Sequence, residues 1–174
     1  PLPSLLDKLN RIGLMVDEWE ERNEDVILEI DTYPNRPDTL GHLGIARELA
    51  TSLKLPLKEK NWPLVETEEK TSNLVDVQTW DEELCPRYCG IVVRNIQVAP
   101  SPEWLRKRIE AMGLKPINNV VDVTNYVLFS TAHPIHAFDL DKIRGRKVII
   151  RRAKNSKILR SLEDKDISLS LIHI

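Results

Sequence analysis

The pattern of apolar positions at the front of the chain predicts a helix followed by two short strands. Residues 4–12 carry a one-sided apolar stripe, formed by Leu5, Leu6, Leu9 and Ile12. Gly13 is placed to end this helix, because a helix exit often needs a left-handed residue. Beyond it, β-type runs at 14–19 and 25–30 flank a charged segment, 20–24, which is expected to be the turn between them.

A second helix is predicted after a segment that proline excludes from regular structure. Pro34 and Pro37 lack the N–H that a strand interior needs, so residues 32–38 are expected to form an extended turn. An apolar stripe then predicts a helix over 40–54. By contrast, residues 61–84 combine proline and charge with little periodicity, which is typical of a linker.

Regular structure is expected to resume with a strand and a clearly bounded helix. Residues 85–98 are rich in β-branched side chains, which favours a strand. Ser101 is a suitable helix cap, Pro102 suits the first helical position, and Gly113 suits the exit. The spacing therefore predicts a helix between Pro102 and Gly113.

The remaining elements complete a mixed α/β pattern without internal repeats. Residues 118–129 are predicted to form a helix, although their β-branched content leaves a buried strand as the alternative. Residues 147–152 and 158–162 are strand-like, and the turn residues around 154–156 indicate a hairpin between them. The sequence thus predicts a mixed α/β (α+β) fold.

Composition narrows the class of protein without assigning a function. Hydrophobic residues make up 41% and charged residues 30%, and the formal net charge is -2. This balance is typical of a soluble globular protein and lacks the basic excess of a dedicated nucleic-acid binder. No apolar run approaches the roughly 20 residues that cross a membrane. The lack of an initiator Met and the apolar end of the chain suggest an excised fragment.

Cysteine and histidine positions give no metal site by themselves. Cys85 and Cys89 form neither a disulfide framework nor a complete set of zinc ligands, so they are interpreted as reduced thiols of a cytosolic protein. His133 and His136 would share a face of a helix, but Pro134 disfavours a helix there. Asn125, eleven residues before His136, is a further polar candidate beside apolar structure.

Several short motifs stand out along the chain: Pro34-Asn35-Arg36-Pro37-Asp38, Gly44-Ile45-Ala46-Arg47-Glu48, Ser101-Pro102-Glu103-Trp104-Leu105, Asn118 to Tyr126, and Pro134-Ile135-His136-Ala137-Phe138-Asp139. Together they resemble the β subunit of bacterial phenylalanyl-tRNA synthetases. They occur in that family's order and spacing, and the resemblance covers about residues 5 to 165.

The resemblance implies an organisation and a function. Residues 1–60 look like the later part of a small α/β B1 segment, 61–84 like a linker, and 85–174 like the first part of an incomplete B3/B4 editing domain with mixed sheets and helices. The implied activity is that of a phenylalanine–tRNA ligase subunit that helps to hydrolyse mischarged Tyr-tRNA(Phe). The fragment alone is expected to be inactive and to lack the aminoacylation site.

The same resemblance implies partners and a location. The family works in the cytoplasm as an α2β2 heterotetramer with an α subunit and tRNA(Phe), and no membrane is involved. ATP and Mg²⁺ are expected to belong to the parent enzyme, and no cofactor or metal site is expected in this chain. Two alternatives remain open: a free-standing hydrolase that edits mischarged tRNA in trans, and a non-catalytic structural B3/B4 module.

Five residues are singled out as candidate site residues by their match to family positions. Thr124, Asn125 and His136 are implied to line the editing site, where they would orient the aminoacyl group, the hydrolytic water or the terminal adenosine. Asn35 and Arg36 are weaker candidates for contact with tRNA or a partner. For the front motif, a structural interpretation is favoured, in which Asp38 caps the next helix and Arg36 bridges to an acidic neighbour.

Two departures from the family pattern fall near the candidate site. The family's Gly-Gln before the Pro-x-His-Ala-Phe-Asp motif is replaced here by Ala132-His133. Loss of this glycine is expected to matter if the turn needs a positive φ. The family's Gly-Glu further on is replaced by Asn155-Ser156-Lys157, which puts the local turn and editing competence in question.

Overall fold

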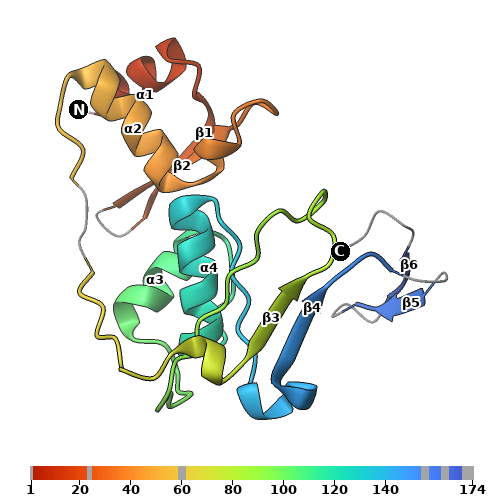
Figure 1. The fold of residues 1–174 in the computed structure, drawn as a ribbon. Coiled ribbons are helices and arrows are strands. Elements are labelled where there is room, and N and C mark those ends of the chain that lie inside the picture. Colours follow the sequence, from red (N-terminus) through yellow and green to blue (C-terminus); the bar gives the residue numbers. More distant parts are fainter. Residues whose placement is uncertain (1, 23–24, 59–61, 154–156, 162–164, 170–174) are drawn as a thin grey trace. The chain divides into compact units, whose positions relative to one another are not determined.

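The computed structural model describes residues 2–22, 25–58, 62–153, 157–161 and 165–169 (Figure 1). Two compact units are present. Unit 1 comprises Pro1–Pro63 with Gln97–Ala137, and unit 2 comprises Leu64–Ile96 with Phe138–Ile174. Helices occur together with two-stranded sheets, which confirms the mixed α/β class.

Unit 1 begins with a helix and an antiparallel hairpin. Helix α1 (Leu2–Arg11) ends before Gly13, whose φ of 83° is the predicted left-handed exit. Strand β1 (Met15–Arg22) pairs with β2 (Asp25–Asp31). The expectation of a charged turn over 20–24 was wrong for its first residues. Their side chains are exposed, so the charges stay in water while the backbone continues the ladder.

The proline-containing segment leads into the second helix of unit 1. Residues 32–38 contain no strand, as predicted, and the 3-10 helix η1 spans Pro37–Leu40. Helix α2 runs from His42 to Leu53, so the predicted helix is confirmed with a later start. Gly41 separates η1 from α2 in an extended conformation.

Two packed helices complete unit 1. Helix α3 spans Glu103–Ala111 and α4 spans Asn119–Thr131, so the helical prediction for the latter holds and the strand alternative does not. The Trp104 and Tyr126 rings meet edge to face, with centroids 5.6 Å apart. Leu105 and Ile109 of α3 are fully buried.

Unit 2 contains a parallel pair of strands that the sequence did not predict. Following the 3-10 helix η2 (Thr71–Asn73), β3 (Asp76–Thr79) pairs with β4 (Lys147–Ile150). The ladder continues as Trp80 N donates to Ile150 O over 2.8 Å. Two short 3-10 helices, η3 (Leu140–Lys142) and η4 (Arg144–Arg146), precede β4.

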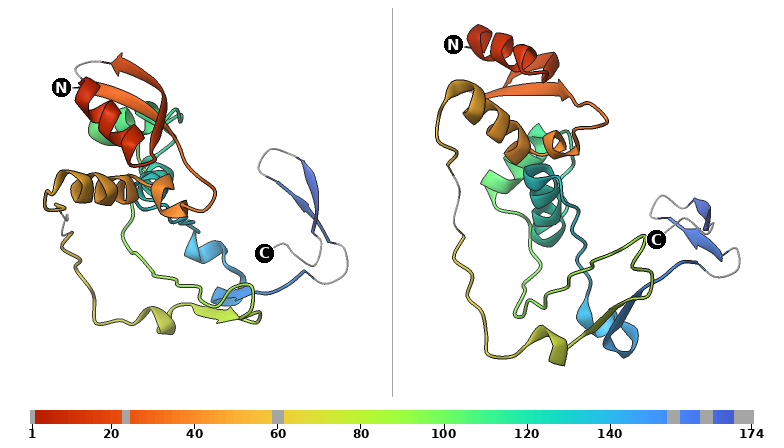
Figure 2. Two further views of the ribbon diagram at one scale, coloured as in Figure 1. Left: turned by 90° about the horizontal axis from the view of Figure 1, so that it is seen from above. Right: turned by 45° about the horizontal axis from the view of Figure 1, so that its top comes forward.

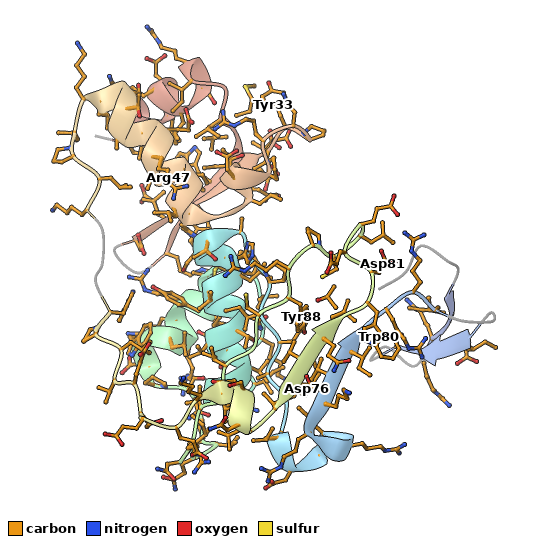
Figure 3. All side chains as sticks on the ribbon, viewed as in Figure 1. Tyr33, Arg47, Asp76, Trp80, Asp81 and Tyr88 are labelled. Carbon is orange, nitrogen blue, oxygen red and sulfur yellow. The ribbon has the colours of Figure 1, made fainter. Side chains whose placement is uncertain are left out.

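Ion pairs that are exposed on at least one side flank the β3–β4 pair at both ends. Asp76, at the start of β3, lies 3.2 Å from Lys147, and Asp81, beyond its end, pairs with Arg152 (Figure 3). Such exposed pairs add little stability, so the pairing depends mainly on the backbone ladder.

The hairpin expected between 147–152 and 158–162 is wrong. Strand β4 pairs with β3, whereas β5 (Lys157–Arg160) pairs antiparallel with β6 (Asp166–Leu169). Strand pairing depends on which partner the tertiary fold brings near, and turn-forming residues nearby do not decide it. The expected turn at 154–156 and the terminal run 170–174 lie outside the described residues.

Two further expectations need correction. The segment predicted as a linker, 61–84, contains η2 and β3, because its four strand residues find a partner 71 residues further on. Residues 85–98, predicted as a strand, form no strand. Their β-branched side chains are largely exposed, with Ile91 at 80%, and Asn95 has a φ of 59°. β propensity reflects packing against neighbouring strands, and this segment has none among the described residues.

Candidate functional site

Helix α4 carries two of the candidate site residues, and polar side chains fix its first turn. Asn118 caps the helix, as its Oδ1 accepts from Val120 N at 3.1 Å and Val121 N at 3.0 Å. Asn119 reaches the segment before α3. Its Nδ2 donates to Gln97 O at 2.9 Å, and its Oδ1 accepts from Ala99 N at 3.1 Å.

Asp122 is a fully buried carboxyl group that joins two loops to α4. Its relative exposure is 0%. It accepts from Ser101 Oγ at 2.5 Å and from Ile117 N at 2.9 Å. Ser101 therefore does not cap α3 as expected, because its hydroxyl is bound by Asp122; Pro102 occupies the N-cap position instead. These contacts hold the first half of α4 in place.

Thr124 and Asn125 are adjacent on α4, and both are half-buried. The Thr124 hydroxyl donates to Val121 O over 2.7 Å, which leaves its oxygen lone pairs available as acceptors. Within the described residues, the Asn125 side chain makes no hydrogen bond, in contrast to Asn118, Asn119 and Asp122. Asn125 is therefore the polar group of this stretch that is available to a ligand.

The chain leaves α4 through a left-handed residue at Ala132. Its φ of 59° and ψ of 25° lie in the region that glycine adopts easily, so the condition under which loss of the family's glycine is expected to matter is met. Ala132 N donates to Leu128 O at 2.8 Å. His136 follows in an exposed segment outside any helix, so His133 and His136 do not share a helical face.

The turn at Ala132 lies against the residue that precedes α2. A Cβ added at Gly41 would lie 2.5 Å from Ala132 N and 2.8 Å from Thr131 C. Next to it, His42 Nδ1 lies 2.7 Å from Phe129 O in the last turn of α4. The two views of Figure 2 show α2 beside α4.

Sequence reasoning missed the contribution of Gly41 and His42. One signal was present: two glycines, Gly41 and Gly44, stand close together at the start of a predicted helix, where glycine lowers stability unless a close approach requires it. A Cβ at Gly44 would collide with the backbone of Asp38. The partner of Gly41, 91 residues away, could not be found from local pattern.

Arg36 is held by two carboxylates. It donates to both oxygens of Asp38, at 3.0 and 2.9 Å, and to Glu48 Oε1 of α2 at 2.7 Å. These hydrogen bonds lower the pKa of Asp38 and raise that of Arg36. The predicted bridge from Arg36 to an acidic neighbour is confirmed. The predicted capping by Asp38 is wrong, since α2 has no side-chain cap and Asp38 is bound to Arg36. Asn35 is exposed.

Neither a metal cluster nor a membrane helix is found in the part of the chain that the structure describes. No group of three or more His, Cys, Asp or Glu side chains there is placed to hold a metal ion. No helix among those residues is long and apolar enough to span a bilayer. Cys89 is an exposed free thiol that accepts from Arg87 Nε at 3.3 Å, and Cys85 is a half-buried free thiol.

Comparison with known protein families matches residues 84–172 to the B3/4 domain. The chain belongs to the B3/4 domain family. The curated relatives include phenylalanine–tRNA ligase β subunits, which confirms the resemblance seen in the sequence motifs. That of Fusobacterium nucleatum is 45% identical over 89% of this chain and 19% of the relative. That of Anaeromyxobacter dehalogenans is 42% identical over 84% of this chain and 18% of the relative.

A third such relative, from Carboxydothermus hydrogenoformans, is 43% identical over 84% of the chain. The chain spans about a fifth of the length of these relatives. The comparisons therefore cover one region of a much longer type of subunit.

Proposed function

We propose that this chain is part of the β subunit of a phenylalanine–tRNA ligase and that its B3/4 region helps to hydrolyse mischarged Tyr-tRNA(Phe). The names of the curated relatives and their 35–45% identity support the first part. The family match over 84–172 supports the second, because that region holds Thr124, Asn125 and His136.

The chemistry of discrimination explains why a second, hydrolytic site is needed. Tyrosine is phenylalanine with one added hydroxyl, and an apolar pocket rejects an added hydroxyl only by about 10²-fold. A polar pocket selects tyrosine better, because phenylalanine would leave its hydrogen-bonding groups unpaired. Hydrolysis of the ester then needs a positioned water and donors for the developing oxyanion.

One observation carries the assignment of roles: the Asn125 amide makes no hydrogen bond within the described residues, whereas its polar neighbours on α4 are engaged. In our proposal, the Asn125 amide binds the aminoacyl group or the water. Thr124 accepts through its free lone pairs, since its proton is directed at Val121 O. His136, which is exposed, contacts the terminal adenosine or the water.

The proposal extends to partners and cofactors of the parent enzyme. The subunit pairs with an α subunit in an α2β2 heterotetramer in the cytoplasm and binds tRNA(Phe). ATP and Mg²⁺ act at an aminoacylation site outside this chain. Asn35 is the better of the two front-motif contact candidates, because Arg36 already donates to Asp38 and Glu48.

A non-catalytic structural role is the second candidate function, and one observation favours it. Asn118, Asn119 and Asp122, three conspicuous polar residues of the motif, all bind backbone or side-chain groups of the fold. A free-standing hydrolase acting in trans remains a third interpretation. It has less support, because residues 1–63 pack with α4 in one unit and are of no evident use to a separate editing domain.

The test is deacylation of preformed Tyr-tRNA(Phe) by the αβ enzyme, comparing wild type with Asn125→Ala, His136→Ala and Thr124→Ala. Removing a group that holds the water or the oxyanion is expected to slow hydrolysis roughly 10²-fold. Thr51→Ala is the matched control, since Thr51 is an exposed residue of helix α2 whose hydroxyl also donates to a backbone carbonyl, Arg47 O at 2.9 Å.

The outcomes separate the candidate functions. Slow hydrolysis by the Asn125→Ala variant, with normal aminoacylation and a normal Thr51→Ala control, supports editing. A wild-type enzyme that leaves Tyr-tRNA(Phe) as stable as buffer does would favour the structural role. Full hydrolysis by all three variants would remove these residues from the site.

A further inference from the structure

The N-terminal end of α2 contacts the C-terminal end of α4 through two consecutive residues. At Gly41 the backbones approach so closely that a methyl group would collide with Ala132 N and Thr131 C. At His42 the imidazole Nδ1 lies 2.7 Å from Phe129 O. The contact joins segments 87 residues apart in the sequence.

His42 supplies a hydrogen-bond donor to a carbonyl group in the last turn of α4. Phe129 lies in the last turn, where a helix leaves its carbonyl groups without the partner that the next turn would supply. Because the acceptor is a carbonyl, His42 Nδ1 carries the proton in this contact.

This contact lies at the turn that joins two of the proposed editing residues. Asn125 projects from α4, and the chain then passes through Ala132 to His136. Ala132 is left-handed, a conformation that costs alanine more than glycine. The turn therefore depends on outside support, and Gly41 and His42 are the residues that lie against it.

Helix α2, which carries Gly41 and His42 at its N-terminal end, is itself held in place by contacts with the preceding turn. Helix α2 carries Glu48, which accepts from Arg36 Nη2 at 2.7 Å, and the closeness of Gly44 to the Asp38 backbone fixes the helix against η1. Displacement of α2 relative to its preceding turn would break these contacts. A fixed α2 can hold the end of α4 in one position.

We propose that His42 is a positioning residue for the editing site, which sets the direction in which the chain leaves α4 and thereby places His136 relative to Asn125. This proposal rests on the proposed function. The N-terminal residues around Gly41 and His42 would then help to orient the editing site. Misplacing a catalytic group by about 1 Å can cost up to about 10²-fold in rate.

The experiment compares His42→Ala and His42→Asn in the αβ enzyme. An asparagine amide can donate from nearly the position of Nδ1, so His42→Asn restores the bond to Phe129 O. We expect His42→Ala to lower kcat for Tyr-tRNA(Phe) hydrolysis about five- to tenfold, with KM and aminoacylation unchanged, and His42→Asn to recover most of it. Arg47→Ala is the control, an exposed residue of α2 (Figure 3).

Hydrogen exchange of the backbone amides in the last turn of α4, up to Ala132 N, which donates to Leu128 O, gives a second measurement that does not depend on activity. Faster exchange in His42→Ala and recovery in His42→Asn support the positioning role, even if the wild-type enzyme proves not to edit. An active wild type, impaired by Asn125→Ala but unaffected in rate and exchange by His42→Ala, overturns the proposal. A wild type without hydrolytic activity overturns the proposed function instead, and exchange then decides the role of His42.

Discussion

Replacing Gly41 with alanine tests whether the close approach between α2 and α4 is an essential contact of unit 1. Gly41 has a φ of -120° and a ψ of 148°, a conformation that alanine also adopts, so no backbone strain is added. The whole effect must come from the added methyl group. That group would lie 2.5 Å from Ala132 N and 2.8 Å from Thr131 C, both backbone atoms that cannot rotate away.

The cost follows from how far α4 must move. Non-bonded heavy atoms rest about 3.5 Å apart, so α4 has to shift by roughly 1 Å. That shift stretches the 2.7 Å contact from His42 Nδ1 to Phe129 O beyond hydrogen-bonding distance. Overpacking costs about 1–3 kcal/mol and a lost hydrogen bond about 1 kcal/mol, so Gly41→Ala should lower the free energy of unfolding by about 2–4 kcal/mol.

Urea unfolding followed by circular dichroism measures this loss, and a double-mutant cycle tests its cause. His42→Ala should cost about 1 kcal/mol in the wild-type background and close to nothing in the Gly41→Ala background. Gly113→Ala is the control: Gly113 has a φ of 74° and open space around it, so it should destabilise without coupling to His42. A loss below about 0.5 kcal/mol for Gly41→Ala, or full additivity with His42→Ala, would refute the reasoning.

Three further predictions concern other contacts of unit 1. Ala132→Gly should raise the free energy of unfolding by up to about 1 kcal/mol in urea unfolding, because glycine adopts a φ of 59° without strain; a lower stability would contradict the strain argument. Asp122→Ala should lower it by about 2–4 kcal/mol, since the buried Ser101 Oγ and the part-buried Ile117 N both lose their acceptor, and thermal unfolding should show Asp122→Asn to be milder. The pKa of Asp38 is lowered in the folded protein, so the ionised carboxylate stabilises the fold at pH values above its ordinary pKa of 3.8, and this stabilisation is lost as the pH falls through the lowered pKa. Asp38→Asn should therefore reduce the loss of stability at acid pH in a profile of unfolding free energy against pH. An unchanged loss would show that the pairing with Arg36 does not cause it.

Elements that depend only on interactions between residues close in the sequence could be predicted from the sequence. Helix α1 and its exit at Gly13 were predicted, since a one-sided stripe and a glycine at the end require only neighbours a few residues apart. The cap of α4 by Asn118 is equally local, with donors two and three residues on, although it was not among the predictions. The family's glycine at the position of Ala132 raised the question of a positive φ there, and the structure answers it with a φ of 59°.

The resemblance to the family identified the candidate site residues, and the structure showed which groups surround them. The motif did not distinguish Asn125 from Asn118 and Asn119, although their environments differ. In the structure, the side chains of Asn118 and Asn119 form hydrogen bonds with backbone groups, whereas the Asn125 amide forms none among the described residues. The roles of Thr124, Asn125 and His136 in editing stay predictions, as do the domain boundaries at 60 and 85.

The sequence by itself determined the helices, because helical hydrogen bonds and apolar periodicity lie within a few residues of one another, and its motifs indicated the family. Only the tertiary structure decided which strands pair and which distant groups meet. Strand β3 pairs with β4 rather than remaining in a linker, and His42 reaches Phe129 across 87 residues. Such contacts form between residues far apart in the sequence, when packing brings them together. The residues near a strand or a histidine in the sequence therefore do not specify its partner.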